Sequence, residues 1–289
     1  MTTPRSAGRL TLVSGKGGVG KSAIATGLAL YAHRQGDRVL AIDVTGGGGL
    51  AAHLGAGPLG FKAQEMRPGL FALAVDRTRA LAEYLKVQIG VPQFATLGPV
   101  ARAFDALAST APGVREVITL GKVLWETQHG GYDLVVADCP PTGQITGLLR
   151  APRTVAELVP SGRVSQQAEW MGRLLLRDQT ELVLVNLAEE LPTVETEETI
   201  ALLASEKLAA SPTVVTNRVL PRLETEARGA GVAAEAAILH RSLYRNQQDW
   251  LKRLSPARKL PYLFGLLTPG EVAARMADAW EHSDLAARA

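Results

Sequence analysis

The chain has 289 residues, of which 46% are hydrophobic and 20% charged, so it has enough apolar material for a buried core. Lysine and arginine exceed aspartate and glutamate by three, 31 against 28, and this small excess does not require an extended basic face for nucleic acid. The single cysteine, Cys139, excludes an intrachain disulfide and a multi-cysteine metal site within one chain. We see neither a secretory leader nor a run of roughly 18 apolar residues, and expect a cytoplasmic protein without a transmembrane segment.

Short apolar runs separated by amphipathic stretches predict an α/β chain. The predicted strands are residues 9–13, 38–43, 70–75, 133–137, 182–187, 213–216 and 260–264. Helical periodicity predicts helices from residue 22 onward and at 78–89, 99–109, 115–128, 154–177, 195–209, 223–255 and 271–285. Continuous apolar strands that alternate with helices are typical of a mostly parallel sheet with helices on both faces. We therefore expect a single domain over 1–289, with a helical subdomain inserted at about 77–130 and 150–178.

The first predicted strand runs into a glycine-rich loop. Residues 15–22 read G-K-G-G-V-G-K-S and fit the phosphate-loop pattern G-x-x-x-x-G-K-[ST], between a strand and a helix. Backbone N–H groups of such a loop bind phosphate oxygens, its final lysine neutralises the β- and γ-phosphates, and the hydroxyl suits Mg²⁺. The nucleotide-binding residues predicted in this way are Gly15, Lys16, Gly17, Gly18, Val19, Gly20, Lys21, Ser22 and Ala23.

The same stretch also fits G-x-G-x-x-G, the fingerprint of a dinucleotide-binding turn. Asp43 even ends the next strand, where a dinucleotide-binding protein keeps the acid that contacts the ribose. A dinucleotide turn, however, has no use for Lys21 followed by Ser22, nor for a second aspartate such as Asp138 at the end of a later strand. We therefore interpret the segment as the phosphate loop of a P-loop protein.

Two strand-ending aspartates are candidates for the chemistry. Phosphoryl transfer needs mainly a placed water and neutralised charge. Asp138 is predicted to hold Mg²⁺ together with Ser22, the carboxylate acting through water, because it ends an apolar strand at the carboxyl edge of the sheet. Asp43 is predicted to orient or deprotonate the attacking water. A helix cap is the alternative role for either aspartate, and a ribose contact is a further one for Asp43. A nucleotide with β- and γ-phosphates and Mg²⁺ are thus the predicted ligands, with Asp43 and Lys21 as catalytic residues.

Lys16 is a second lysine in the loop. With it, residues 16–22 have the form K-G-G-x-G-K-[ST], a deviant Walker A motif. In families with this motif the early lysine reaches across a dimer interface to the nucleotide of the partner subunit. By that resemblance Lys16 is a third catalytic residue, which would stabilise charge in the transition state as an arginine finger does. The alternative is a solvated charge on the loop.

Further segments extend this likeness over most of the chain. They are residues 70–76 with 82–84, 111–116, the Y-D-x-x-x-x-D strand at 132–138, P-T-G at 141–143, and 189–196. With them the sequence resembles the arsenical pump-driving ATPase family, which includes the ATPase that targets tail-anchored membrane proteins. The resemblance implies a P-loop sheet with a helical subdomain, a nucleotide-gated homodimer, and adenine recognition by Asn217.

Two segments depart from the family pattern. The first switch, D-P-A-H in the family, reads V-T-G-G-G-G after Asp43, and the second switch ends in Gln144 instead of histidine. Four consecutive glycines have high conformational entropy, so we expect nucleotide to order this loop at some cost and hydrolysis to be slow or partner-dependent. The amide of Gln144 can hydrogen-bond phosphate or water, but it cannot act as an acid or a base.

Three classes of function fit these features. The first is a nucleotide-switched dimer, of identical or related subunits, that couples ATP to the binding or delivery of a protein client. The second, an arsenite-pump motor, is disfavoured because arsenite needs several thiolates and the chain offers one. The third is a partition or positioning ATPase on DNA or membrane; the acidic tail is short for a membrane anchor, and no stable nucleic-acid partner is expected. We favour the client-coupled ATPase, with a nucleotide-binding switch of little turnover as a further alternative.

Overall fold

The computed structural model describes residues 8–89, 113–159, 161–209, 212–223, 231–254 and 256–288. Within these residues eight strands form one sheet in the order β3-β4-β2-β5-β1-β6-β7-β8. The strands are β1 (Arg9–Gly15), β2 (Val39–Asp43), β3 (Gln64–Arg67), β4 (Leu70–Ala74), β5 (Leu134–Asp138), β6 (Thr180–Leu187), β7 (Thr213–Val219) and β8 (Arg258–Pro261). Every neighbouring pair is parallel except β3 with β4. The predicted α/β class with a mostly parallel sheet is confirmed.

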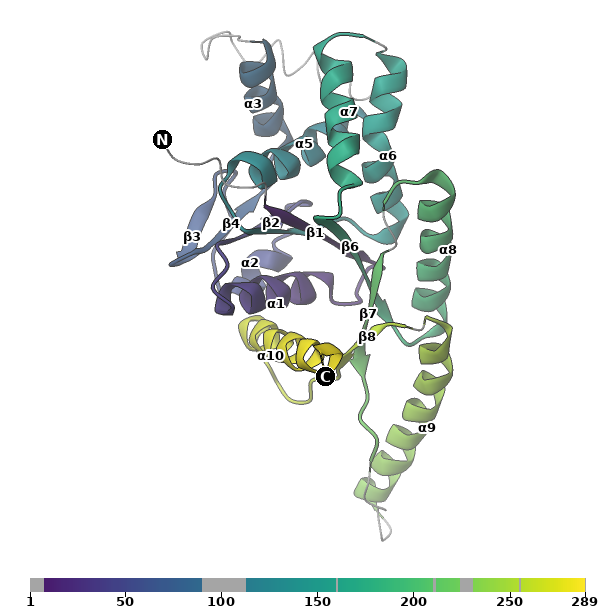
Figure 1. Ribbon diagram of the computed structural model, residues 1–289. Coiled ribbons are helices and arrows are strands. Elements are labelled where there is room, and N and C mark those ends of the chain that lie inside the picture. Colours follow the sequence, from purple (N-terminus) through teal and green to yellow (C-terminus); the bar gives the residue numbers. More distant parts are fainter. Residues whose placement is uncertain are drawn as a thin grey trace.

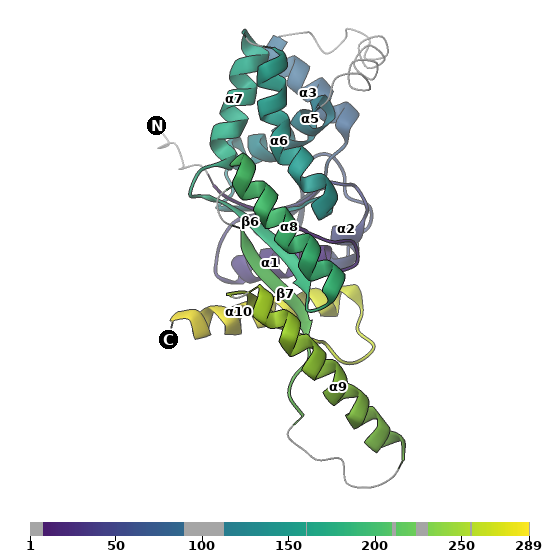
Figure 2. The same ribbon diagram turned by 90° about the vertical axis from the view of Figure 1, so that its right-hand side faces the viewer.

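Helices cover both faces of this sheet. They are α1 (Lys21–Arg34), α2 (Gly49–Leu54), α3 (Arg77–Ile89), α5 (Val114–His129), α6 (Thr142–Leu158), α7 (Arg163–Leu175), α8 (Glu190–Glu206), α9 (Val232–Arg253) and α10 (Pro269–Arg288). In Figure 1, α1, α2 and α10 lie below the sheet, and α5, α6 and α7 lie above it. Figure 2 shows α9 extending away from the body of the molecule. Among the described residues no helix is long and apolar enough to cross a membrane.

Each face of the sheet has its own hydrophobic core, and alternate residues of a strand enter opposite cores. On β2, Leu40 and Ile42 pack with apolar side chains of α5, α6 and α7, whereas Val39 and Ala41 pack with those of α1 and α10. All four residues are fully buried. The strands read as unbroken apolar runs because both of their faces are covered.

The predicted helix at 154–177 is wrong in its extent, because the structure has two helices there. Helix α6 begins twelve residues earlier, at Thr142, and ends at Leu158, and α7 follows from Arg163. Pro141 precedes α6 in extended conformation, so the proline signals the start of the helix and not a loop. Gly162, with a φ of 92°, separates the two helices, since a residue in this conformation cannot continue a right-handed helix.

Other predicted boundaries shift as well. The helix predicted at 223–255 begins at Val232, and the strand predicted at 260–264 ends at Pro261. The antiparallel strand β3 was not predicted, because its exposed polar residues lack an apolar pattern. The helix predicted at 99–109 lies outside the described residues. The inserted subdomain stays a prediction; α3, α5, α6 and α7 lie together on one side of the sheet, but α6 begins before residue 150.

Helix α10 packs against α1 so closely that Gly27 has no space for a side chain. A β-carbon on Gly27 would lie 2.5 Å from Cβ of Met276 and 3.2 Å from the Met276 carbonyl carbon. Contacts this short require one of the two helix backbones to move. Gly147, in α6, provides a matched helical glycine, because a β-carbon there meets nothing within 4 Å.

We predict that Gly27→Ala lowers the free energy of unfolding by about 1–3 kcal/mol, the usual cost of forcing extra atoms into a packed core. Gly147→Ala should instead raise it by up to about 1 kcal/mol, because alanine is the better helix former. Urea unfolding of both variants measures the difference. Equal stability of the two variants would show that α1 and α10 separate easily.

Candidate functional site

The carboxyl ends of three adjacent strands bring the predicted site residues together. In the parallel register of β2 with β5, Asp43 pairs with Asp138, and in that of β1 with β5, Val13 pairs with Asp138. Strand β1 continues through the glycine-rich loop into α1, whose first residue is Lys21. The phosphate loop and the two predicted carboxylates therefore share one edge of the sheet, the usual place for ligands in an open α/β fold.

Glycine is required in the loop for steric reasons. Gly15 has a φ of 149°, and a β-carbon there would lie 2.2 Å from the carbonyl oxygen of Val185 on β6. Gly20, with a φ of 95°, precedes α1 and would place a β-carbon 2.6 Å from Nδ2 of Asn217. By contrast, a β-carbon on Gly17 or Gly18 would meet nothing within 4 Å, and Gly18 needs glycine for its φ of 84° and not for lack of space.

Asp138 is a buried carboxylate next to the first turn of α1, with only 5% of its surface exposed. Burial raises its pKa to about 6; a hydrogen bond from the Ser22 hydroxyl opposes the rise, the charge of Asp43 adds to it, and Lys21 opposes it. Burial also lowers the pKa of Lys21, against the charges of Asp138 and Glu195. The Lys21 ammonium donates to the carbonyl oxygen of Lys16 at 3.2 Å.

Asp43 is 2% exposed and anchors the loop that follows it. Its Oδ1 accepts from the backbone N–H and the hydroxyl of Thr45, both at 3.1 Å, and from the N–H of Gly46 at 2.7 Å. Its Oδ2 accepts from the N–H of Gly48 at 2.9 Å. The catalytic role predicted for Asp43 stays a prediction, and the structure adds this anchoring role to it.

The four-glycine segment is a turn into α2 and not an irregular loop over its whole length. Gly46 and Gly48 have φ values of 69° and 75°, and α2 begins at Gly49. A β-carbon on Gly49 would lie 2.6 Å from the hydroxyl oxygen of Ser22. The glycines thus permit two left-handed residues and a close approach of α2 to the phosphate loop.

A cavity of about 660 Å³ opens beside the phosphate loop. Its lining combines loop and helix residues that include Gly18, Lys21 and Ser22 with Tyr262, Leu263 and other apolar residues from the segment after β8 and from α10. Polar groups for phosphates and apolar groups for a base, around this volume, suit a nucleoside triphosphate.

Asn217 lines the same cavity but is 4% exposed. Its Nδ2 donates to the carbonyl oxygen of Val19 at 2.9 Å, and its Oδ1 accepts from the N–H of Arg218 at 2.8 Å. In this structure Asn217 therefore ties β7 to the phosphate loop. Its reading of adenine stays a prediction.

The residues present fit a magnesium ion. A serine hydroxyl that follows the loop lysine and a buried carboxylate hydrogen-bonded to it provide two oxygen groups, the ligand type that Mg²⁺ takes, and leave room for water ligands. Among the described residues no cluster of three or more histidine, cysteine, aspartate or glutamate side chains could hold a metal ion.

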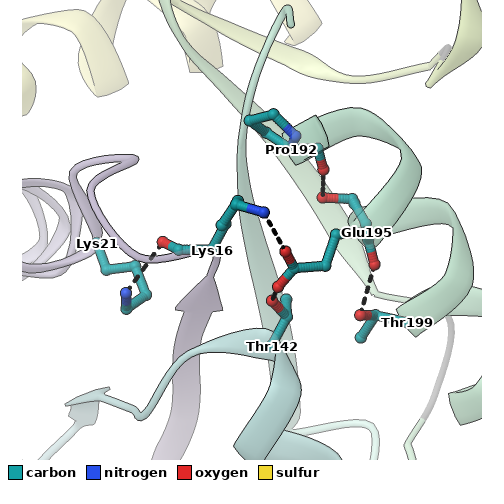
Figure 3. Close-up of polar contacts among 7 residues, drawn as sticks. Lys16, Lys21, Thr142, Pro192, Glu195 and Thr199 are labelled. Atoms are coloured by element: carbon teal, nitrogen blue, oxygen red, sulfur yellow. Dashed lines mark hydrogen bonds and ion pairs between the residues drawn. The ribbon is translucent and has the colours of Figure 1, made fainter. Parts of the chain in front are cut away.

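Three other residues singled out in the sequence, Gln144, Cys139 and Lys16, lie in different surroundings. Gln144 lines a separate cavity of about 140 Å³, together with Thr45, Arg77 and Arg115, and is not among the residues that line the phosphate-loop cavity. Cys139 is 1% exposed, and burial raises the pKa of its thiol, so it packs as a small buried apolar side chain. Lys16 forms an ion pair with Glu195 of α8, 2.7 Å from Nζ to Oε2 (Figure 3).

Sequence reasoning missed two parts of the site. Glu195 contacts the loop although it lies 179 residues from Lys16. It falls in the family-like segment 189–196, but no role was predicted for it. Tyr262 and Leu263 fell in a predicted strand, but they lie beyond the end of β8 and line the cavity. The glycine at 265, with a φ of 110°, is the local signal that this segment turns.

The fold and this site define the chain as a P-loop ATPase. The family model described as an anion-transporting ATPase matches residues 8–177, more than half of the chain. ATPase BagA of Mycobacterium tuberculosis is 36% identical over 235 residues, which cover 75% of this chain and 67% of BagA. ATPase get3 of Pyrenophora tritici-repentis is 29% identical over 171 residues, 58% of this chain and 50% of that protein. ATPase GET3 of Phaeosphaeria nodorum is also 29% identical over 171 residues, 58% of this chain and 52% of that protein.

The chain therefore belongs to the anion-transporting ATPase family, the arsenical pump-driving type that its sequence resembles, and it is an ATPase of that family.

We predict that Asp138→Asn stabilises the protein at neutral pH when Mg²⁺ and nucleotide are absent. Between about pH 4 and 6 the unfolded chain has lost the Asp138 proton and the folded chain keeps it, so folding stability falls as pH rises through this range. The amide avoids that cost, up to about 3 kcal/mol for a shift of this size.

Urea unfolding in EDTA at pH 7.5 and at pH 4 measures the effect. Asp138→Asn should be the more stable protein at pH 7.5, and the gap should close at pH 4. As a control, Asp249→Asn removes a carboxylate that is 77% exposed and should change stability little at either pH. A gap of the same size at both pH values would mean that burial of the Asp138 charge is not the cause.

Proposed function

We propose that this protein is a Mg²⁺-dependent ATPase that works as a nucleotide-switched dimer and couples ATP to the binding or delivery of a protein client. The observation that carries the proposal is the register that places Asp43 beside Asp138, with Ser22 of the phosphate loop hydrogen-bonded to Asp138. A loop for phosphates, a hydroxyl and carboxylate for the ion and a second carboxylate for water are the parts that phosphoryl transfer requires.

Each residue has a distinct role in this proposal. The backbone of the loop and Lys21 hold the phosphates, and Ser22 with Asp138 holds Mg²⁺, Asp138 through water. When bound, the ion neutralises charge on the β- and γ-phosphates. Asp43 orients the attacking water, for which its loop must release part of the carboxylate. Asn217, beside the cavity, selects adenine.

The dimer follows from the presence of two lysines in one phosphate loop. Lys21 already provides the intrachain positive charge for the terminal phosphates, so Lys16 is redundant there unless it serves a second nucleotide. Two subunits that face each other across their phosphate loops use both lysines. Since each chain has one cysteine, and it is buried, a zinc clamp of four thiolates does not hold this dimer, and nucleotide provides closing energy by mass action.

An exposed apolar surface supports a client with apolar character. Leu158, Val159 and Val164, on either side of the connection between α6 and α7, are 57%, 38% and 39% exposed. This connection lies at the ends of the two helices that are remote from the sheet (Figure 1). Apolar side chains left exposed near one helix connection offer contacts for an apolar client segment. Arsenite is not the proposed cargo, because Cys139 is the chain's single thiol.

We expect the protein to convert ATP to ADP and phosphate with Mg²⁺ and not in EDTA. Its mass, measured by light scattering after size exclusion, should double with Mg²⁺ and a non-hydrolysable ATP analogue.

Lys16→Ala should bind the analogue within a few-fold of the parent but dimerise weakly and hydrolyse slowly. Lys62→Ala, which removes another exposed lysine, should behave as the parent does. A parent that stays monomeric with the analogue, or Lys16→Ala protein that dimerises normally, would contradict the dimer.

Asp43→Asn should lower kcat by about 10²-fold or more, the scale for a misplaced reacting group, with ATP affinity within a few-fold of the parent. Analogue binding and urea unfolding on the same variant separate the loss of water positioning from a collapse of the loop that Asp43 anchors. Turnover equal to that of the parent would leave Asp43 with the anchoring role alone.

A further inference from the structure

One carboxylate outside the phosphate loop joins three parts of the site. Glu195, in the first half of α8, accepts from the Lys16 ammonium through Oε2 at 2.7 Å. Its other oxygen, Oε1, accepts from the hydroxyl of Thr142, the first residue of α6. Figure 3 shows the carboxylate between these two partners. Glu195 thereby links the phosphate loop to the segment that follows Asp138.

The charge of Glu195 is present at neutral pH. Burial raises its pKa, but the hydrogen bonds from Lys16 and Thr142 outweigh that effect, so the pKa is lowered overall. The same charge acts on Lys21. The Glu195 carboxylate thus lies against the lysines of a loop that binds phosphate. The carboxylate and the phosphates of the nucleotide compete for Lys16.

The backbone that carries Glu195 is held in place, so its carboxylate can move only as far as its own side chain allows. The hydroxyl of Thr199 donates to the Glu195 carbonyl oxygen at 2.7 Å, and that of Thr196 donates to the carbonyl oxygen of Pro192 at 2.8 Å (Figure 3). Thr193 and Thr196 are 0% and 1% exposed, so this stretch of α8 is fixed on the sheet. If Lys16 reaches toward another subunit, the ion pair must lengthen or break.

We propose that Glu195 is a positioning residue that holds Lys16 within its own chain, so that the dimer closes only when nucleotide phosphates draw Lys16 away from Glu195. The inference rests on the cross-subunit role proposed above for Lys16. Among the described residues, release of Lys16 leaves the Thr142 hydroxyl as the remaining hydrogen-bond donor to the carboxylate, which connects the state of the loop to the start of α6.

The test uses the full chain and a non-hydrolysable ATP analogue with Mg²⁺. Glu195→Gln keeps the size of the side chain and an acceptor for Thr142, but removes the charge. We expect it to dimerise at an analogue concentration about 2- to 5-fold lower than the parent needs, because a partly exposed ion pair contributes modestly. Glu195→Asp keeps the charge but shortens the reach to Lys16, and should give a smaller change in the same direction.

Glu197→Gln is the matched control. Glu197 lies two residues along α8 and pairs with Arg253, away from the loop, so its loss should leave the dimerisation midpoint unchanged. A double-mutant cycle gives a readout that a merely structural role would not produce. In a Lys16→Ala background, Glu195→Gln should have no further effect on the midpoint. Urea unfolding checks that each variant is folded.

The outcomes separate this inference from the function it rests on. If the parent dimerises with the analogue but Glu195→Gln has an unchanged or higher midpoint, Glu195 does not restrain Lys16 and the inference is wrong. If Glu195→Gln lowers the midpoint equally with and without Lys16, it acts by another route and the inference is again wrong. If the parent never dimerises, the proposed dimer fails, and the inference fails with it.

Discussion

Parallel pairing of β2 with β5 places Asp43 directly beside Asp138, and both carboxylates are almost completely buried. The charge of Asp43 adds to the cost of ionising the buried carboxyl of Asp138. The two carboxylates have different partners. Asp43 accepts four hydrogen bonds from the loop that follows it, whereas Asp138 accepts from Ser22 and faces the positive charge of Lys21. Asp138 is left the less compensated, and it is the group that a divalent cation would stabilise most.

This electrostatic arrangement explains why a glycine-rich first switch is compatible with a folded site. A carboxylate that needs N–H donors organises the backbone after it, and Gly46 and Gly48 supply those donors from left-handed positions that other residues adopt with strain. The entropy that four glycines lose is offset by these bonds and by the close contact of Gly49 with Ser22. The departure from D-P-A-H therefore changes how the loop is held, and it need not leave the loop without structure.

The parts of the site that the sequence predicted are those whose position follows from backbone periodicity. A buried parallel strand must be continuously apolar, so the ends of β2 and β5, and hence Asp43 and Asp138, could be placed at one edge before any contact was known. The loop from Gly15 to Ser22 was identified because its chemistry is local. The start of α6 at Thr142 was missed because a proline that opens a helix resembles one that ends it. The break between α6 and α7 was missed although Gly162 marks it. The cavity wall at Tyr262 was missed because a strand and an extended loop look alike in an apolar segment.

The contacts of Glu195 could not be predicted from sequence periodicity. Its partners are 179 and 53 residues away. In sequence it is one of several acidic residues in and after the family-like segment 189–196, and nothing there separates it from the others. The packing of α8 beside the carboxyl edge of the sheet is what brings the Glu195 charge to the phosphate loop. The two lysines of the loop then differ in kind: Lys21 is held by a backbone carbonyl and by charges inside the site, whereas Lys16 is held by a single side chain on another element. A lysine held by one partly exposed ion pair is the one that can change partners at low cost, and this is the property that a residue serving a second subunit needs.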